Sequence, residues 1–417
     1  MALPLSLSIA VRHLSHRRRQ TVTSLLGISL GVAFFIAIAS MMQGFQRDFV
    51  ARIIDVSPHI TIKDEFRSPP RQPVQQVYAH AALVALRGLK PKDETRGIRG
   101  ARAIIEALGQ MPGLKAAPTL TGNILLRFGS KDISATISGI VPDQERQVTK
   151  LEKDLITGSL DRLYTAANGI IIGEGIALKA NIATDDMVSV ISPEGVVMRM
   201  KVVGIFRSGI TSMDNFETYA LLKKAQVLQN RPNIINRIRL RLEDVEQARV
   251  LAQGLESRFG YRSESWQEQS SNILGLFVIQ NAIMYSTVGA ILIVACFGIF
   301  NVISTVVFEK TKDIGILKSM GFRDAQIRRI FIAEGMMVGL IGTVLGWALG
   351  YGLVEFMGTL DFKMEGFVRA QGFILYRTPI HYLISGAMAM TSSTFAAWLP
   401  ARRASRLQPV DIVRGAA

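Results

Sequence analysis

The residues that could carry covalent chemistry are few, and their surroundings argue against it. Gly27-Ile28-Ser29-Leu30-Gly31 has the G-x-S-x-G spacing of a serine-hydrolase nucleophile, but that motif needs a strand, a sharp turn and a helix, and these residues lie inside a continuous apolar run. His13 and His16 are spaced like metal ligands, yet no acidic or sulfur partner lies nearby, and contact with lipid headgroups explains them better. We therefore predict no catalytic residue and no metal site.

The nucleotide-binding motifs are incomplete as well. Gly173-Glu174-Gly175 follows a β-branched run like the opening of a dinucleotide fingerprint, but no third glycine follows at the required spacing. The sequence has no Gly-Lys dipeptide, which excludes the Walker A phosphate loop. The chain is thus expected to bind no cofactor directly and to hydrolyse no ATP by that route.

The longest elements that the sequence predicts are four apolar windows, and any functional residue would be positioned by them. Residues 21–42, 269–308 and 378–401 contain no Asp, Glu, Lys or Arg, and residues 330–357 contain only two Glu. Each window exceeds the about 20 helical residues that cross a bilayer. Arg17-Arg18-Arg19 before the first window would suit a signal peptide, but its 22 uncharged residues exceed a signal core of about 7 to 15 and favour an uncleaved helix.

The distribution of positive charge predicts the orientation in the membrane. Residues 1–20, 309–329 and 401–417 carry 14 Lys and Arg against 4 acids, and such an excess marks the cytoplasmic side. The net charge of +15 therefore does not indicate a nucleic-acid binder, because the basic residues are spread over segments that flank the membrane. Cys296 is the only cysteine, so the chain can form no internal disulfide.

These patterns predict an α-helical membrane protein with four transmembrane helices and a large external α+β domain that contains a mainly β subdomain. The predicted segments are, in order, a cytoplasmic N-terminal segment at 1–20, a first span at 21–43, the external domain at 44–271 with its β subdomain at about 166–215, a second span with an external stalk at 272–308, a cytoplasmic segment at 309–329, a third span at 330–357, a short external loop at 358–377, a fourth span at 378–400 and a cytoplasmic tail at 401–417.

Within the external domain, residue patterns predict short alternating elements. Helical spacing occurs at 100–109, 221–229 and 244–259, and β-branched or alternating runs occur at 124–128, 133–140, 170–172, 188–191, 202–205 and 234–242. The Pro- and charge-rich stretch at 67–99 has no clean period and is read as an extended insertion or mobile loop.

Small residues recur at helical spacing in two of the apolar windows. Such spacing lets helices approach closely in lipid, and packing within one subunit is favoured over a dimer seam or a substrate path. The residues are Gly27 and Gly31 in the first window and Gly335, Gly339, Gly342, Gly346 and Gly350 in the third. Glu334 is a functional candidate because it is an acid in a span, but snorkelling or pairing with Arg328 or Arg329 is the favoured reading.

The charged segment 309–329 separates two apolar windows and has a helical pattern of its own. Ile314, Leu317 and Met320 recur at a spacing of three, which predicts a short amphipathic helix with an apolar edge for a partner. Gly321 is predicted to end this helix as its C′ residue, and Asp324 is predicted to cap the next one.

Three features of the membrane part resemble the MacB/FtsX-type permeases of ABC transporters. They are EKTKDIGILKSMG (309–321), the Glu- and Gly-containing third helix, and LPARRASRLQPVDIVRG (399–415). The resemblance implies that the first of these is a coupling helix that docks on a separate ATPase subunit, which would bind the ATP and Mg. This chain would then be a transporter subunit and not an enzyme. The implied coupling residues are Glu309, Lys312, Asp313, Ile314, Gly315, Leu317, Lys318 and Gly321.

The external domain resembles the LolC/LolE branch, the lipoprotein-releasing permeases of Gram-negative inner membranes. SPHITI (57–62), NGIIIGEGIALKANIATDDMVSVISPEG (168–195) and VVGIFRSGITSMDNFETYALLKKAQ (202–226) carry this likeness. It implies a homo- or heterodimer of permeases with two ATPase subunits, which extracts lipoproteins from the membrane and passes them to a periplasmic chaperone. The implied lipid-binding cavity is lined by Phe34, Phe35, Ile38, Met41, Met42, Phe277, Ile283 and Met284.

Other functions within the same superfamily stay open. A MacB-like permease would export a drug, peptide or glycolipid, and an FtsX-like relay would switch an external hydrolase. The 228-residue external domain counts against the relay, because FtsX-like proteins have a smaller one. The 67–99 insertion has no counterpart in the family pattern, and the chain can be LolC-like, LolE-like or homodimeric.

Overall fold

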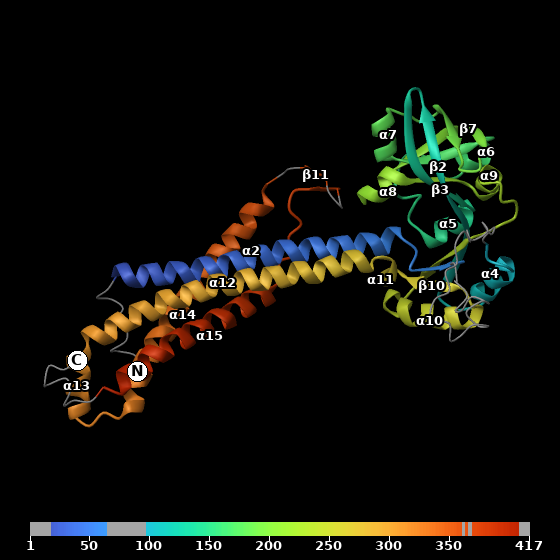
Figure 1. Ribbon diagram of the computed structural model, residues 1–417. Helices are drawn as coiled ribbons and strands as arrows, with labels where there is room; N and C mark the ends of the chain where they lie inside the picture. Colours follow the sequence, from blue (N-terminus) through green and yellow to red (C-terminus); the bar gives the residue numbers. More distant parts are fainter. Residues whose placement is uncertain (1–17, 65–96, 361–362, 366–368, 408–417) are drawn as a thin grey trace, which may run out of the picture. The chain divides into compact units, whose positions relative to one another are not determined.

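The computed structural model describes residues 18–64, 97–360, 363–365 and 369–407 (Figure 1). His13, His16, most of the 67–99 insertion and the last ten residues of the predicted tail lie outside the described residues. The chain forms two compact units. The helical unit contains the chain up to Asp48, Gly275–Lys363 and the chain from Gln371 onward, and the sheet unit contains Phe49–Leu274 and Met364–Ala370.

Long helices make up the helical unit. Within the described residues, three helices are long and apolar enough to cross a membrane, namely α2 (Arg18–Val56), α12 (Ser271–Glu309) and α14 (Asp324–Gly358). The helix α15 (Pro379–Ser405) occupies the predicted fourth span but is not among these candidates, so four transmembrane helices stay a prediction. Between α12 and α14 lies the short helix α13 (Thr311–Ser319), and β11 (Lys363–Glu365) and β12 (Arg369–Gln371) form a small separate sheet.

The four long helices lie side by side (Figure 1). One apolar core joins them. Phe35 and Ile36 of α2, Ile299 of α12, Phe331 of α14 and Ala397 of α15 are all buried in it. On α12 the buried side chains form a single stripe from Met284 to Val306, while the other side of the helix is exposed. An apolar helix with one buried stripe and an apolar exposed face is typical of a helix that borders lipid or another helix.

Five of the seven glycines of α14 lie closest to two other helices of the same chain. Gly335 and Gly339 lie against Ala397 and Ser393 of α15. The remaining three face α2, where a Cβ built on Gly342, Gly346 or Gly350 would lie 2.9, 2.6 or 2.9 Å from the side chain of Ile28, Val32 or Ile36. Real Cβ atoms do not approach so closely, so α14 can lie between α2 and α15 only because these positions lack a side chain.

Gly27 and Gly31 of α2 face a third helix. A Cβ on Gly31 would lie 3.2 Å from Cγ2 of Ile291 in α12, and one on Gly27 would lie 3.7 Å from Cβ of Ala295. The second distance is ordinary van der Waals contact, so Gly31 is the tighter of the two positions. The glycines of α2 and α14 thus bring α2 close to both α12 and α14.

A mixed sheet of ten strands forms the sheet unit, in the order β10-β1-β9-β2-β3-β8-β5-β7-β4, with β6 pairing β2 and β7. The strands are β1 (Ile60–Lys63), β2 (Leu114–Phe128), β3 (Lys131–Ile140), β4 (Leu155–Gly158), β5 (Gly169–Gly173), β6 (Met187–Ile191), β7 (Val197–Phe206), β8 (Glu217–Leu221), β9 (Arg237–Leu242) and β10 (Arg262–Ser265). The helices of this unit are α4 (Ala101–Gly109), α5 (Pro142–Val148), α6 (Arg162–Thr165), α7 (Glu174–Ala180), α8 (Thr211–Phe216), α9 (Leu222–Leu228), η1 (Val245–Gln247), α10 (Ala248–Phe259) and α11 (Trp266–Gln269). The predicted α+β character of this region is confirmed.

The 15-residue strand β2 belongs to both parts of the sheet, the part around β9 and the part around β6. The subdomain boundary therefore differs from the predicted one. Its first half pairs with β9, and residues near its end pair with β6. The sequence placed 124–128 and 133–140 outside the β subdomain at about 166–215, but the corresponding parts of β2 and β3 pack with β5, β6 and β7 in one apolar cluster. Strand pairing is non-local, so residue patterns along the chain identify strands without showing which strands share a core.

Two adjacent strands, β1 and β10, lie next to the end of α2 and the start of α11. Strand β1 follows α2, strand β10 precedes α11 and α12, and the two strands pair antiparallel from Ile60 opposite Ser265 to Lys63 opposite Arg262. The backbone N–H of Trp266 donates to the carbonyl of His59 over 2.9 Å. The end of α2 and the start of α11 are therefore fixed to the same hydrogen-bonded ladder.

His59 is buried at this junction and makes both ring hydrogen bonds. Its Nε2 lies 3.1 Å from the carbonyl oxygen of Ile54 in α2, and its Nδ1 accepts from the backbone N–H of Leu242 over 3.1 Å. These partners require a neutral ring that carries its proton on Nε2. Burial, followed by the charge of Arg241, lowers the pKa of His59 despite the opposing charge of Asp55.

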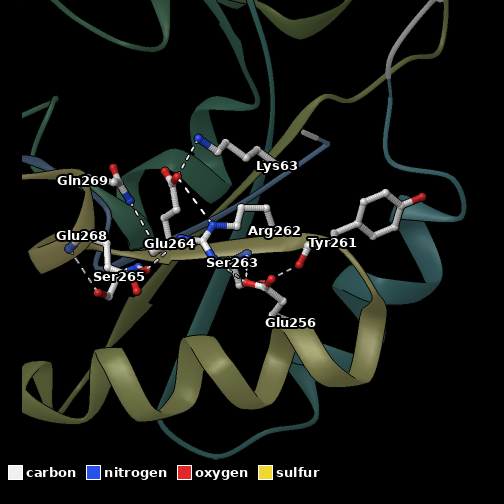
Figure 2. A network of polar contacts seen from close by, with 9 residues as sticks. All are labelled: Lys63, Glu256, Tyr261, Arg262, Ser263, Glu264, Ser265, Glu268 and Gln269. Atoms are coloured by element: carbon white, nitrogen blue, oxygen red, sulfur yellow. Dashed lines mark hydrogen bonds and ion pairs between the residues drawn. The ribbon is translucent and has the colours of Figure 1, made fainter. Parts of the chain in front are cut away.

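Figure 2 shows the polar network around β10. Arg262 lies 3.3 Å from a carboxylate oxygen of Glu256 and 3.8 Å from one of Glu264, and Lys63 of β1 also pairs with Glu264 over 2.7 Å. Ser265 and Glu268 form a capping box at the start of α11. These groups are partly exposed, so each pair contributes little, but together they favour one register of β10.

A substitution in α14 tests the close helix packing. Gly346→Ala should lower the free energy of unfolding by about 1 to 3 kcal/mol, because the added methyl overlaps Val32. Gly352→Ala is the matched control in the same helix, where nothing lies within 4 Å of the added atom, and it should leave stability equal or slightly higher. Thermal unfolding of the detergent-solubilised protein measures both, and equal midpoints for the two variants would contradict this packing.

A pH series tests the role of His59. Because the pKa is lowered in the folded state, the unfolded chain binds the proton more readily below its ordinary pKa of about 6.5. Stability should therefore be retained above that pH and lost as the pH falls from about 7 to 5. His59→Gln, which keeps a donor and an acceptor but does not titrate, should show a shallower dependence of the unfolding midpoint on pH. Parallel curves for the two proteins would exclude His59 as the source.

Candidate functional site

The short helix α13 ends as the sequence predicts. Gly321 has a positive φ of 95° and follows the last residues of the helix. The N–H of Phe322 donates to the carbonyl of Leu317 over 3.1 Å, and the N–H of Gly321 donates to that of Lys318 over 3.0 Å. This pair of hydrogen bonds is the Schellman motif, and it fixes the turn from α13 into α14.

The predicted cap at Asp324 is wrong. Arg323 is the N-cap residue of α14, and its N–H donates to the side-chain Oε1 of Gln326 over 2.8 Å. Asp324 is the first residue of the helix and pairs with Nζ of Lys318 over 2.8 Å. The side chain of Gln326 satisfies the N–H at the start of α14, which leaves the carboxylate of Asp324 free to pair with the lysine.

Lys318 connects three helices around this turn. Its Nζ donates to the carbonyls of Ser405 at the end of α15 and of Leu407 beyond it, over 2.6 and 2.8 Å, in addition to its contact with Asp324. Only 11% of its side chain is exposed. The lysine therefore holds α13 against the ends of α14 and α15.

The apolar residues of α13 divide between an inner and an outer face. Ile314 is buried, and Leu317 packs against the same core together with Ile327 and Phe331 of α14. Met320 is 73% exposed, so the predicted edge of Ile314, Leu317 and Met320 is not one surface. A groove of about 270 Å³ runs between α13 and the start of α14 and is lined by Lys310, Asp313, Ile314, Ile316, Leu317, Ile327, Ile330 and Phe331.

We define the outer face of α13 by four exposed residues, Lys312, Asp313 and Ile316 of the helix and Met320 directly after it. Ile316 is 59% exposed. It is not among the residues of the apolar edge that the sequence predicts. The signal is its position four residues before Met320, which places both on the same side of a helix. Asp313 pairs with Lys310 over 2.8 Å, Glu309 is exposed at the end of α12, and Gly315 is buried. The face thus combines two apolar groups with charges of both signs.

The side chains predicted to line a lipid cavity do not share one face. Phe35 and Met284 are 2% and 4% exposed and belong to the helical core, whereas Phe34 and Ile283 are 47% and 60% exposed. Four more, Ile38, Met41, Met42 and Phe277, have intermediate exposure. The ring of Phe277 meets that of Phe45 edge to face, with centroids 6.1 Å apart.

A polar contact between α2 and α12 lies near these residues. Nε2 of Gln46 donates to Oδ1 of Asn281 over 3.1 Å. A sequence signal for this contact exists, because Gln280 and Asn281 interrupt an otherwise apolar window. A side-chain amide pair of this kind holds two apolar helices in one register.

Two segments of the sheet unit that carry the family likeness pack against each other. Gly173 and Gly175 lie against Asp214 and Asn215 of α8, and Arg207 forms an ion pair with Glu174. Asp214 is fully buried, and its Oδ1 accepts from the N–H and the Oγ of Ser208, each over 2.8 Å. These contacts fix the loop between β7 and β8, which makes the segment a structural element of the sheet unit.

No metal centre is found in the described part of the chain, where no three His, Cys, Asp or Glu side chains are grouped to hold an ion. What the structure offers at α13 is an exposed surface with apolar groups, Ile316 and Met320, beside the charged Lys312 and Asp313.

Comparison with known proteins agrees with this arrangement. The model for the MacB-like periplasmic core domain matches residues 21–258, and the model for the FtsX-like permease C-terminal region matches residues 285–409. The lipoprotein-releasing system transmembrane protein LolC of Xylella fastidiosa is 28% identical over 99% of both chains.

Two further relatives are a second lipoprotein-releasing protein and a macrolide export protein. The lipoprotein-releasing system transmembrane protein LolE of Haemophilus influenzae is 26% identical over 94% of this chain and 93% of its own length. The macrolide export ATP-binding/permease protein MacB of Hyphomonas neptunium is 25% identical over 97% of this chain and 60% of its own length. Since the first family model covers more than half of the sequence, the chain belongs to the MacB/FtsX family of ABC transporter permeases.

Proposed function

We propose that this protein is the permease subunit of a system that uses ATP hydrolysis by a separate subunit to extract lipoproteins from the bacterial inner membrane and pass them to a periplasmic chaperone. The observation that carries this proposal is the match to LolC over 99% of both chains, which includes the sheet unit as well as the helices. The sequence has no Walker A loop, so ATP and Mg would be bound by the partner ATPase.

The outer face of α13 is the proposed docking surface for that ATPase. Ile316 and Met320 present apolar groups beside Lys312 and Asp313, and Lys318 anchors the helix from behind. The remaining predicted coupling residues Glu309, Ile314, Gly315, Leu317 and Gly321 would set the position and the ends of the helix. With the positive-inside arrangement, α13 and both termini lie in the cytoplasm, where an ATPase is available.

Transmission to the sheet unit would use α2 and α12. Along the chain, α2 leads into β1, and β10 leads through α11 into α12. The strands β1 and β10 pair with each other, and Trp266 donates to His59 beside them. A movement of either helix would therefore act on the same ladder of hydrogen bonds. The glycine contacts make α2 and α14 a closely packed pair within each subunit. In this proposal, a nucleotide-dependent movement that starts at α13 would reach the sheet unit along α2 and α12.

The lipid-binding cavity is proposed to form at the exposed side of α2 and α12. Phe34 and Ile283 face outward there and would contact acyl chains, with Ile38, Met41, Met42 and Phe277 at the edge. Phe35 and Met284 would instead support the wall from within the core. A second permease, identical or related, would close the cavity, because the exposed faces of one chain leave it open.

A MacB-like export function is the second candidate. The specific observation in its favour is that the MacB-like periplasmic core model matches residues 21–258 and that MacB of Hyphomonas neptunium matches 97% of this chain. The substrate would then be a drug, peptide or glycolipid. An FtsX-like signal relay would act on an external hydrolase, and here the FtsX-like model matches only residues 285–409.

A substitution on the outer face of α13 tests the docking surface. Ile316→Asp should weaken association with the ATPase at least tenfold, because it places a charge where an apolar contact is expected. Val250→Asp is the matched control, since Val250 is 74% exposed on α10 of the sheet unit and should leave association unchanged. Co-purification of the subunits measures the effect, and normal recovery with Ile316→Asp would refute the assignment. Leu317 is less suitable, because its replacement would also disturb packing.

Depletion in the native cell tests the proposed transport. Lipoproteins destined for the outer membrane should accumulate in the inner membrane within a few generations, as measured in separated membrane fractions. Complementation with the wild-type gene should reverse the accumulation, and complementation with Ile316→Asp should not. An unchanged distribution would exclude lipoprotein release and would favour the export function.

A further inference from the structure

A groove on the outer surface of the helical unit lies between α14 and α15. It contains none of the predicted coupling or lipid-cavity residues. Its volume is about 600 Å³. The lining residues are Met336 of α14 and Met390, Thr391, Thr394, Phe395 and Trp398 of α15. Phe395 is 75% exposed and Trp398 is 41% exposed, so the groove is open to whatever surrounds the helices.

The groove offers no free hydroxyl group to an occupant. Oγ1 of Thr391 donates to the carbonyl of Ala387 over 2.9 Å, and Oγ1 of Thr394 donates to that of Met390 over 2.7 Å. Both hydroxyls are thus used within α15, and the threonines present their methyl groups. Two methionines add flexible apolar walls, which adapt to a chain without a fixed shape.

One end of the groove carries positive charge. The rings of Phe395 and Trp398 are stacked, with centroids 6.5 Å apart and an angle of 16° between the planes. The guanidinium carbon of Arg402 lies 5.5 Å from the centroid of the Trp398 ring. Arg402 and Arg403 are both exposed at this end of α15. An aromatic ring beside a cation is typical of the level at which lipid headgroups begin.

We propose that this groove binds one anionic glycerophospholipid, with an acyl chain along Met336, Met390 and Phe395 and the phosphate headgroup on Arg402. The charge at one end of an otherwise apolar groove is complementary to such a lipid. The proposal goes beyond lipoprotein release and rests only on α14 and α15 lying in the membrane.

A helix from a second copy fits the groove less well. Helix pairs in lipid approach through small residues, and five of the seven glycines of α14 already contact α2 or α15. The groove presents Met, Thr and stacked aromatic groups in their place. A flexible acyl chain can adapt to this uneven surface. A rigid helix would leave gaps beside Phe395.

Quenching of tryptophan fluorescence by brominated lipid tests the proposal on the full-length protein. The protein is placed in nanodiscs that contain equal amounts of phosphatidylglycerol and phosphatidylcholine, with bromine on the acyl chains of one lipid or of the other. The chain has three tryptophans. The fluorescence of the Trp398→Phe variant comes from the other two, and subtracting it from the wild-type fluorescence gives the signal of Trp398. Quenching of the Trp398 signal should indicate about a fivefold preference for phosphatidylglycerol.

Two neighbouring arginines provide matched variants. Arg402→Gln should reduce the preference to about one, and Arg403→Gln should retain it, because only Arg402 lies over the ring of Trp398. Equal quenching by the two lipids in the wild-type protein would overturn the proposal in favour of ordinary surrounding lipid. Quenching that is the same with and without Trp398 would also overturn it, since protein would then fill the groove. The assay measures lipid binding alone, so its failure is distinct from a failure of lipoprotein release.

Discussion

The pairing of β1 with β10 is the constraint on which the rest of the structure depends. It brings together two strands that are almost 200 residues apart in the chain and that are joined closely to α2 and α12. His59 adds hydrogen bonds to α2, to β9 and to the start of α11 at the same point. Because these bonds are buried, the end of α2 and the start of α11 cannot separate without breaking them.

The helical unit satisfies a second constraint with small residues. Helix α14 approaches α15 through Gly335 and Gly339 and approaches α2 through Gly342, Gly346 and Gly350. Association in lipid gains little from the hydrophobic effect and depends on close contact, so one helix with two glycine faces can hold two neighbours. Other bulky side chains of α2 and α12, such as Phe34 and Ile283, remain exposed.

The position of α13 follows from these contacts. Its inner side chains Ile314 and Leu317 pack against α14, and Lys318 binds the carbonyls at the end of α15. The helix is therefore held against α14 and α15, while Ile316 and Met320 are exposed on the outside. A partner that binds this face would act on the membrane helices directly.

Much of the architecture was predictable from local patterns. Uncharged windows predicted the long helices, β-branched runs predicted most strands, and the glycine at position 321 predicted where α13 ends. Each of these features depends on residues close together in the chain. The family likeness also came from contiguous motifs, and the family models cover the same regions.

The sequence by itself determined which segments are apolar, where α13 stops and which small residues permit close packing. Only the tertiary structure decided that β2 joins both parts of the sheet, that Ile314 and Leu317 face inward while Met320 faces outward, and that Asp324 pairs with Lys318 in place of capping α14. The physical reason is that strand partners, the rotation of a helix about its axis and the choice between competing hydrogen bonds are set by groups distant in the chain, which a local pattern does not contain.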